Sequence, residues 1–272
     1  MTTETSGSGD LDRTLGLLWG TADRPTRGPK PALALNRIVA TAVAVADAEG
    51  IGAVSMRRIA TELGTGTMSL YRYVPGKAEL LDLMLNHVSD PDLAPTADDG
   101  GAGGQGGEGC VWRSTVDAMA RGHLQLYRAH PWLLKISQAR AVLGPSSLRA
   151  LETALSGLRS TGLRDPELIS VVIMVQGFVT GIARTEIEAA EAREATGQSE
   201  EEFWAQQAPY LERAMRSGEY PVSATLSEET FSRDFDHFEF GLKRIVDGIA
   251  VLIEERAEER DKGRGGERGG GA

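Results

Sequence analysis

Cysteine is almost missing from this 272-residue chain, which contains only Cys110. A single thiol excludes an internal disulfide framework and is typical of proteins in a reducing compartment. The polar, acidic first residues, "MTTETSGSGDLD", also lack the basic and apolar regions of a secretory signal. We therefore expect a cytoplasmic protein.

Long hydrophobic runs are scarce as well. The longest nearly apolar run covers residues 168–183, and its 16 residues fall short of the roughly 20 that span a bilayer. We interpret it as a buried helix and expect no membrane partner. No window alternates apolar and polar residues as a strand does, whereas apolar residues recur at helical spacing along most of the chain. The sequence predicts an all-α fold.

Positive charge is in deficit, with 29 Lys and Arg against 39 Asp and Glu. The deficit is uneven, because residues 24–77 hold eight basic and three acidic residues, a balance of +5, and the remainder carries −15. This asymmetry indicates an anion-binding end on an acidic body. An ordinary solvated surface is the alternative.

Glycine and proline are concentrated at the predicted boundaries. The stretch "RPTRGPKP" forbids regular helix, and "DDGGAGGQGGEG" has seven glycines and no large apolar side chain that could favour ordering. We predict a flexible basic arm (1–32), a helix-turn-helix domain (33–88), a Gly-rich disordered loop (89–109), a helical domain (110–256) and a disordered tail (257–272).

The first domain has a pattern of short helices. One is predicted over 33–49 and stops at Gly50, and Ser55 caps a second that ends at Gly64. A helix barely two turns long follows in "GTGTMSLYRYVPGK", and a fourth begins after the Pro-Gly pair. Because a helix that short is unstable alone in water, its inner face must be held and its outer face is free to bind. Two helices joined by such a turn favour a helix-turn-helix whose second helix enters the DNA major groove.

These residues carry a family resemblance. The segment "LNRIVATAVAVADAEGIGAVSMRRIATELGTGTMSLYRYVPGKAELLDLML", residues 35–85, resembles the N-terminal DNA-binding domain of the tetracycline-repressor (TetR) family of bacterial transcription regulators. The match includes an alanine-rich first helix ending in Glu-Gly, then Arg-Arg-Ile-Ala-Thr-Glu-Leu-Gly, then Ser-Leu-Tyr, and a lysine six positions after that tyrosine.

The resemblance implies contacts with base edges and phosphates. Tyr71 and Lys77 would hold phosphates, and the ring of Tyr73 would either pack or add a phosphate contact. The candidate DNA contacts are Ser55, Arg57, Thr67, Met68, Ser69, Tyr71, Arg72, Tyr73 and Lys77.

The second domain is expected to contain helices at about 110–129, 131–138, 146–160, 165–195, 200–217 and 228–256. "PWL" and "FEFGLKRIVDGI" resemble the tetracycline-repressor-type C-terminal domain, which implies a homodimer. A heptad seam, with small residues on a second helix, gives the candidate interface: Phe231, Phe235, Phe238, Leu242, Ile245, Ile249, Gly177 and Gly181. Packing inside one subunit is the alternative.

A small-molecule cavity is implied by the same resemblance. Aromatic, polarisable and polar residues of this domain and of the helix before the glycine loop are candidates for its lining, although they fit a plain core equally well. They are Met84, Trp112, Met119, His123, Tyr127, Trp132, Met174, Gln176, Phe178 and Trp204. His123 and His130 lack a third metal ligand, so we expect neither metal nor cofactor.

By resemblance, the protein is a homodimeric repressor that binds a palindromic operator and is released by a small-molecule effector of unknown identity. Its partners would be double-stranded DNA, the effector and a second copy. Two alternatives remain: a DNA-binding regulator controlled by a protein partner or by autoregulation, and a helical-bundle enzyme. The enzyme has little support, because the sequence offers no arguable Ser/His/Asp set or paired carboxylates.

Overall fold

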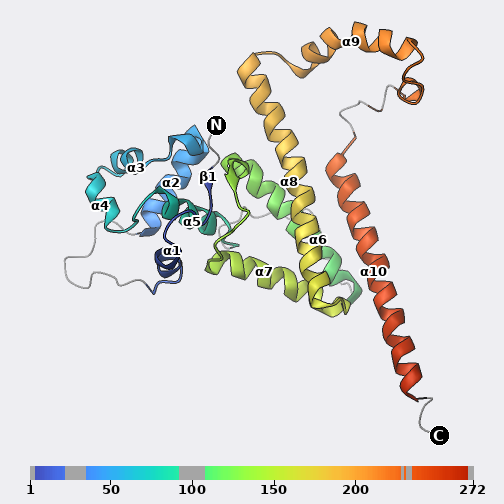
Figure 1. The fold of residues 1–272 in the computed structure, drawn as a ribbon, viewed down its shortest axis with the longest axis horizontal. Coiled ribbons are helices and arrows are strands. Elements are labelled where there is room, and N and C mark those ends of the chain that lie inside the picture. The colour runs from blue at the N-terminus through green and yellow to red at the C-terminus, as the bar shows by residue number, and fades with distance from the viewer. Residues whose placement is uncertain (1–3, 22–34, 92–107, 228–229, 231–234, 269–272) are drawn as a thin grey trace.

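The computed structural model describes residues 4–21, 35–91, 108–227, 230 and 235–268. These residues form two helical domains (Figure 1). A small N-terminal domain, here called the head, holds helices α2 to α5. The second, here called the effector domain, is built from long helices. The all-α prediction is confirmed, and the described strands are two residues long each.

The head has the predicted order of short helices. Its elements are α2 (Leu35–Glu49), the 3₁₀ turn η1 (Ile51–Ala53), α3 (Met56–Glu62), α4 (Thr67–Tyr71) and α5 (Lys77–Val88). Their apolar faces meet in one core in which Ile38, Ile59, Leu70 and Leu80 are fully buried. That core positions α4, because a five-residue helix depends on tertiary packing for its stability.

The effector domain packs around three long helices. They are α6 (Glu108–Ala129), α8 (Asp165–Thr196) and α10 (His237–Arg268), and α7 (Pro145–Leu158) closes one side. The remaining elements are η2 (Pro131–Lys135), β2 (Ile136–Ser137), η3 (Arg159–Thr161), α9 (Glu200–Arg216) and η4 (Ser223–Thr225). α9 stands apart from the helical bundle (Figure 1), and none of its residues is buried.

Helix α8 contains the apolar run of the sequence. By length and composition alone it could cross a membrane. Its apolar residues Val172, Val175 and Val179 are nevertheless buried in the core shared with α6 and α10. This packing fits the predicted role of a buried helix.

The predicted dimer seam on α10 lies mainly inside the subunit. Phe238, Leu242 and Ile249 are 8%, 3% and 2% exposed and pack into the subunit's own core, and Ile245 packs beside them. The assignment of Phe238, Leu242 and Ile249 to a dimer interface was wrong, because a heptad pattern identifies a buried face but not its partner. Ile245 is only partly buried, and its assignment stays a prediction. Phe235 is exposed, and Phe231 lies outside the described residues.

A close contact between α8 and α10 explains why residue 241 is a glycine. The rings of Phe178 and Phe238 stack with their centroids 6.0 Å apart. A side chain at Gly241 would overlap the Phe178 ring. Glycine therefore lets α8 and α10 approach each other within one subunit.

The predicted arm and tail also need correction. Residues 4–21 contain strand β1 (Glu4–Thr5) and helix α1 (Leu11–Leu18), which begins at the Asp10 cap and packs on α5. The rest of the arm, and most of the glycine loop, lie outside the described residues. α10 continues to Arg268, so much of the predicted disordered tail is helical.

One predicted helix differs in the structure, and one ion pair that was not predicted joins α8 to α10. The predicted helix over 131–138 is a 3₁₀ turn that begins at Pro131 and runs into β2. Glu167 at the start of α8 bonds Arg256 of α10 at 2.7 Å. Hydrogen bonds from Arg164, and then those from Arg256, lower the pKa of Glu167 to about 2. This carboxylate therefore stays charged at neutral pH and fixes α10 against α8.

Candidate DNA-reading head and effector site

The turn between α3 and α4 is built for a sharp change of direction. Ser55 accepts a hydrogen bond from the Arg58 amide at 3.1 Å and caps α3. The helix ends at Glu62 with Leu63 as its C-cap, and Gly64 follows with φ of 64°, a left-handed conformation that favours glycine. The predicted cap and turn are confirmed. The hydroxyl of Ser55 has a structural role there, whatever it contacts in DNA.

Helix α4 has one inner and several outer side chains. Leu70 is fully buried in the head's core, whereas Met68 is 78% exposed and Tyr71 is 41% exposed. Ser69 is also exposed, and the surface is hollowed between Met68, Ser69, Tyr71 and Arg72. The helix is anchored by its leucine and presents the other side chains to solvent, as the sequence predicted.

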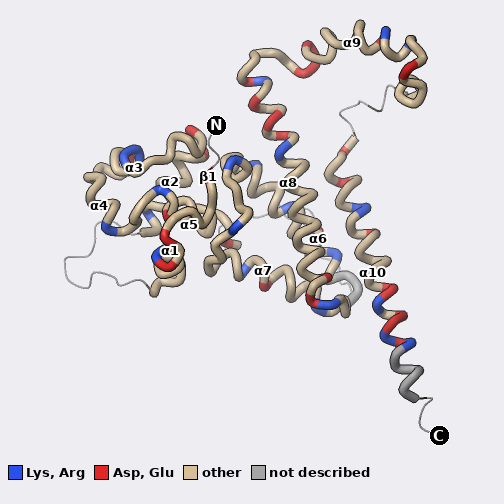
Figure 2. The backbone as a smooth tube through the Cα atoms, viewed as in Figure 1, with Lys and Arg blue, Asp and Glu red and all other residues tan. Residues whose placement is uncertain are grey.

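Basic side chains flank this surface. Arg57 and Arg72 are exposed, and Figure 2 shows Lys and Arg on α3 and at the end of α4. Arg58 bonds Glu49 at 2.7 Å and Glu62 at 2.6 Å, and these bonds raise its pKa. Arg58 is therefore engaged within the head, while Arg57 and Arg72 are exposed to solvent.

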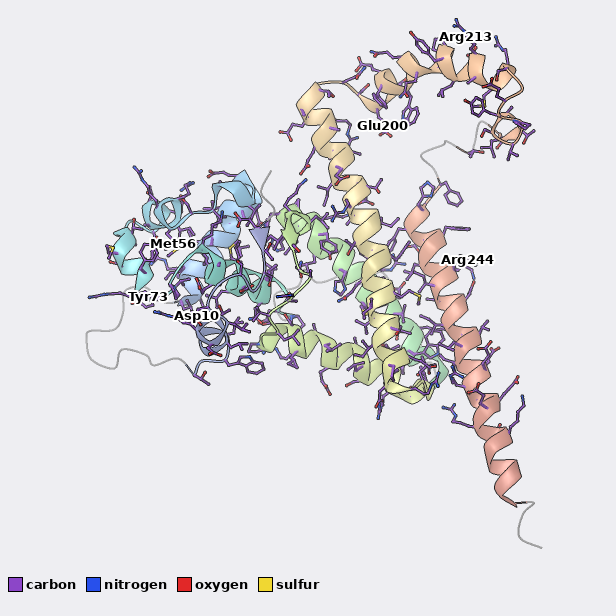
Figure 3. All side chains as sticks on the ribbon, in the orientation of Figure 1. Asp10, Met56, Tyr73, Glu200, Arg213 and Arg244 are labelled. Atoms are coloured by element: carbon purple, nitrogen blue, oxygen red, sulfur yellow. The ribbon has the colours of Figure 1, made fainter. Side chains whose placement is uncertain are left out.

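Two of the predicted phosphate contacts have partners in the protein. Tyr73, labelled in Figure 3, is half-buried and packs against the head's core, which favours packing as the role of its ring. Lys77, the first residue of α5, forms an ion pair with Glu4 at 2.7 Å. The sequence did not reveal this pair, because Glu4 lies in the segment that was predicted to be flexible.

Polar side chains meet between α6 and α8 of the effector domain. His123 Nδ1 lies 2.8 Å from the Met119 carbonyl oxygen, and its Nε2 lies 3.3 Å from the Gln176 amide nitrogen. Burial lowers the pKa of His123, so the ring is neutral at pH 7. The carbonyl places the proton on Nδ1 and leaves Nε2 to accept from Gln176.

A second pair extends this polar row. The Tyr127 hydroxyl lies 3.1 Å from Thr180 Oγ1, which donates to the Gln176 carbonyl at 2.7 Å. Thr180 was not among the sequence candidates, because a threonine within an apolar helix gives no signal by itself. Of those candidates, Met119, His123, Tyr127 and Gln176 lie together, with Phe178 further along α8.

Other pocket candidates lie elsewhere. Met84 and Trp132 are buried in the head's core, so their assignment to an effector cavity was wrong. Trp204 is 51% exposed on α9, and Met174 is 44% exposed on α8. Trp112 belongs to the effector domain's core, where Arg113 covers its ring. Aromatic character alone does not distinguish a cavity lining from a core.

The domain junction has an acceptor that the sequence did not indicate. Asp47 of α2 accepts a hydrogen bond from Trp132 Nε1 at 2.6 Å, and His130 Nδ1 lies 2.7 Å from the same oxygen. Both ring side chains come from the end of α6 and from η2. One carboxylate of the head therefore binds two residues of the effector domain.

No group of three or more His, Cys, Asp or Glu side chains is arranged to hold a metal ion in the part of the chain that the structure describes. The side chains of the head and of the polar row interact through hydrogen bonds and ion pairs.

Comparison with known proteins places this geometry in a family. Residues 38–84 match the bacterial regulatory proteins of the tetR family, and residues 104–253 match the tetracyclin repressor-like C-terminal domain. The chain is 56% identical over 257 residues to the HTH-type transcriptional repressor DrrR1 of Streptomyces coeruleorubidus, a match covering 94% of this chain and 92% of that one.

Solved structures agree. The Streptomyces coelicolor TetR family protein ActR in complex with actinorhodin is 31% identical, with a TM-score of 0.63 over 81% of this chain and 97% of that one. ActR in complex with (S)-DNPA is also 31% identical, with a TM-score of 0.55 over 83% of this chain and all of that one. The chain therefore belongs to the tetR family of bacterial regulatory proteins and is a ligand-responsive DNA-binding transcriptional repressor, not an enzyme.

Proposed function

We propose that α4 reads an operator in the major groove and that an effector held between α6 and α8 releases it. The observation that carries the DNA role is the anchoring of α4 by Leu70 while Met68, Ser69 and Tyr71 face outward. Thr67 and Ser69 offer hydroxyls to bases or backbone, and Met68 offers an apolar contact. The repressor acts in the cytoplasm, where bacterial DNA lies.

Phosphates are bound by the surrounding residues in this proposal. Arg57 and Arg72 flank α4 and are exposed, and the Tyr71 hydroxyl reaches from its end. Lys77 joins them when it leaves Glu4. Contacts of this kind give affinity and register, whereas the outer face of α4 gives sequence selectivity.

The active form is a homodimer through the outer faces of α8 and α10. Ile169, Ile173 and Met174 are 39%, 62% and 44% exposed on α8, and Phe240 and Val251 are 54% and 55% exposed on α10. Open space lies beside Gly177 and Gly181, where a second backbone could approach. Apolar side chains exposed on two long neighbouring helices favour a four-helix interface. Gly177 and Gly181 therefore keep their predicted place at the dimer interface in this proposal.

A charge at the centre of this face should separate the subunits. In a symmetric interface Ile173→Glu buries two carboxylates, so we expect a monomer at micromolar concentration in sedimentation velocity, with weakened operator binding. Leu148→Glu, on an α7 leucine that is 39% exposed, is the matched control and should stay dimeric. A dimer in both variants, or a monomeric wild type, would contradict this interface.

The effector site is the polar row of His123, Gln176, Tyr127 and Thr180, next to Met119. Neutral imidazole, amide and hydroxyl groups can orient a ligand's oxygen atoms, while the neighbouring apolar and aromatic side chains cover its flat surfaces. The ligands in the solved ActR complexes, actinorhodin and (S)-DNPA, are the probes to use first.

The test measures release of a labelled operator during titration with each probe. We expect release by at least one probe and a response at least about tenfold weaker in Gln176→Leu, because an amide partner that the ligand uses is lost. Leu148→Ala is the control and should respond as wild type does. Failure of both probes would contradict an effector chemistry shared with ActR, and an unchanged response in Gln176→Leu would contradict the site.

A further inference from the structure

The N-terminal segment, residues 4–18, connects the two domains and is here called the strap. Its strand β1 pairs in parallel with β2, with Glu4 opposite Ile136 and Thr5 opposite Ser137. The Ser6 amide also donates to the Ser137 carbonyl at 3.0 Å. β2 follows η2 and precedes α7, and its Ile136 is buried in the head's core, so this end of the strap is paired with the domain junction.

Two acidic side chains of α5 hold the strap against the head. Asp82 is 2% exposed and accepts hydrogen bonds from the Ser6 hydroxyl at 2.7 Å and from the Gly7 amide at 3.0 Å. Glu79 is 7% exposed and accepts from the Asp10 amide at 3.0 Å. Burying a carboxylate is unfavourable without such partners. These bonds therefore specify where the strap lies.

The fit of the strap is close at one glycine. A side chain at Gly9 would overlap the Glu79 carboxylate, so the backbone passes directly against α5. Beyond it, α1 packs along α5, and Leu17 and Leu18 join the head's core. The strap is thus a built part of the fold, fixed on α5 and on β2 at the domain junction.

This position places Glu4 beside a DNA-binding residue. The Glu4 carboxylate lies 2.7 Å from Lys77 Nζ, and the two side chains are 35% and 32% exposed. A carboxylate and an operator phosphate are alternative partners for the one ammonium group. We propose that Glu4 is an intramolecular competitor of the operator phosphate for Lys77, held in place by its pairing with β2 at the domain junction. This inference rests on the proposed phosphate contact of Lys77.

The partial exposure of the pair sets the size of the effect. A half-exposed ion pair is weak and is screened by salt, so DNA can displace Glu4. Because Glu4 is paired with β2 at the domain junction while Lys77 belongs to α5, a movement of this junction relative to α5 changes the competition. Glu4 therefore links the position of the domain junction to a single phosphate contact.

The test is a double-mutant cycle on operator affinity, measured by fluorescence anisotropy at low salt with the full-length protein. Glu4→Gln, Lys77→Gln and their combination are compared with Asp12→Asn. Asp12 is the control because it lies in the same strap, is exposed and loses the same charge. We expect Glu4→Gln to bind about two- to fivefold more tightly than Asp12→Asn, the range of a half-exposed pair. In the Lys77→Gln background, Glu4→Gln should give no gain in operator affinity.

The other outcomes separate this inference from the phosphate contact itself. Lys77→Gln alone should weaken binding and lower the salt slope by about one per subunit. If Lys77→Gln does so but Glu4→Gln binds the operator no more tightly than Asp12→Asn, the competition is overturned and the phosphate contact stands. The same conclusion follows if Glu4→Gln tightens operator binding equally in the Lys77→Gln background. If Lys77→Gln changes neither affinity nor slope, the contact and the competition both fall.

Discussion

In the Leu70→Ala variant, operator binding is expected to weaken by about 30-fold or more while the effector domain stays folded. Leu70 is the one buried side chain of α4 and is fully buried. Removing a buried leucine side chain costs about 2–5 kcal/mol. A five-residue helix depends on tertiary packing for its stability, and Leu70 is the buried side chain that α4 contributes, so the cost falls on local unfolding of α4. At about 1.4 kcal/mol for each factor of ten, the smallest cost gives a loss of roughly 30-fold.

The measurement is operator affinity by anisotropy, with thermal unfolding recorded on the same samples. Leu158→Ala is the matched control, because Leu158 is also fully buried but lies in α7 of the effector domain. It should lose comparable stability and keep operator affinity within about threefold of wild type, since it leaves α4 intact. Equal losses of affinity in both variants, or full affinity in Leu70→Ala, would contradict the role of Leu70 as the anchor of the reading helix.

Replacement of Trp132 by alanine is expected to lower the free energy of unfolding by about 3–5 kcal/mol, the usual cost of deleting a buried aromatic side chain. Trp132 comes from η2 but is 2% exposed within the head's core, and its Nε1 bonds Asp47. It is therefore one of the side chains that attach the effector domain to the head. We expect the variant to unfold in two separate thermal transitions, because the head loses this attachment.

Two controls distinguish the junction from a general loss of an aromatic ring. Trp132→Phe keeps most of the packing but loses the N–H donor, and should cost only about 1–3 kcal/mol. Trp204→Ala removes a tryptophan that is 51% exposed on α9 and should change stability by no more than about 0.5 kcal/mol. A Trp132→Ala protein that unfolds in one transition with the wild-type midpoint would show that the two domains are joined by other contacts.

The head could be predicted in detail because its signals are local. The apolar spacing of α2, the Ser55 cap and the turn at Gly64 are each determined by residues within a few positions of one another. The strap could not be predicted in this way. Its partners on α5 are 69 to 76 residues away in the sequence, so a segment of ordinary polar composition gave no local indication of order.

The effector domain shows a different limit of sequence patterns. Heptad spacing correctly marked Phe238, Leu242 and Ile249 as buried, but the side chains they pack against belong to the same subunit. Similarly, Met84 and Trp132 have the character of a cavity lining yet fill the head's core. Periodicity and residue type predict that a side chain is covered, and only the three-dimensional arrangement shows what covers it.

The most direct test of the central claim is anisotropy of the full-length protein on labelled DNA from upstream of its own gene. The titration is repeated at several salt concentrations beside an Arg57→Ala/Tyr71→Ala protein and a scrambled DNA. The account predicts tight, salt-dependent binding that is selective for the upstream DNA and lost in the double variant. Equal affinity for scrambled DNA, or undiminished binding by the double variant, would contradict α4 and its flanking residues as the reading surface.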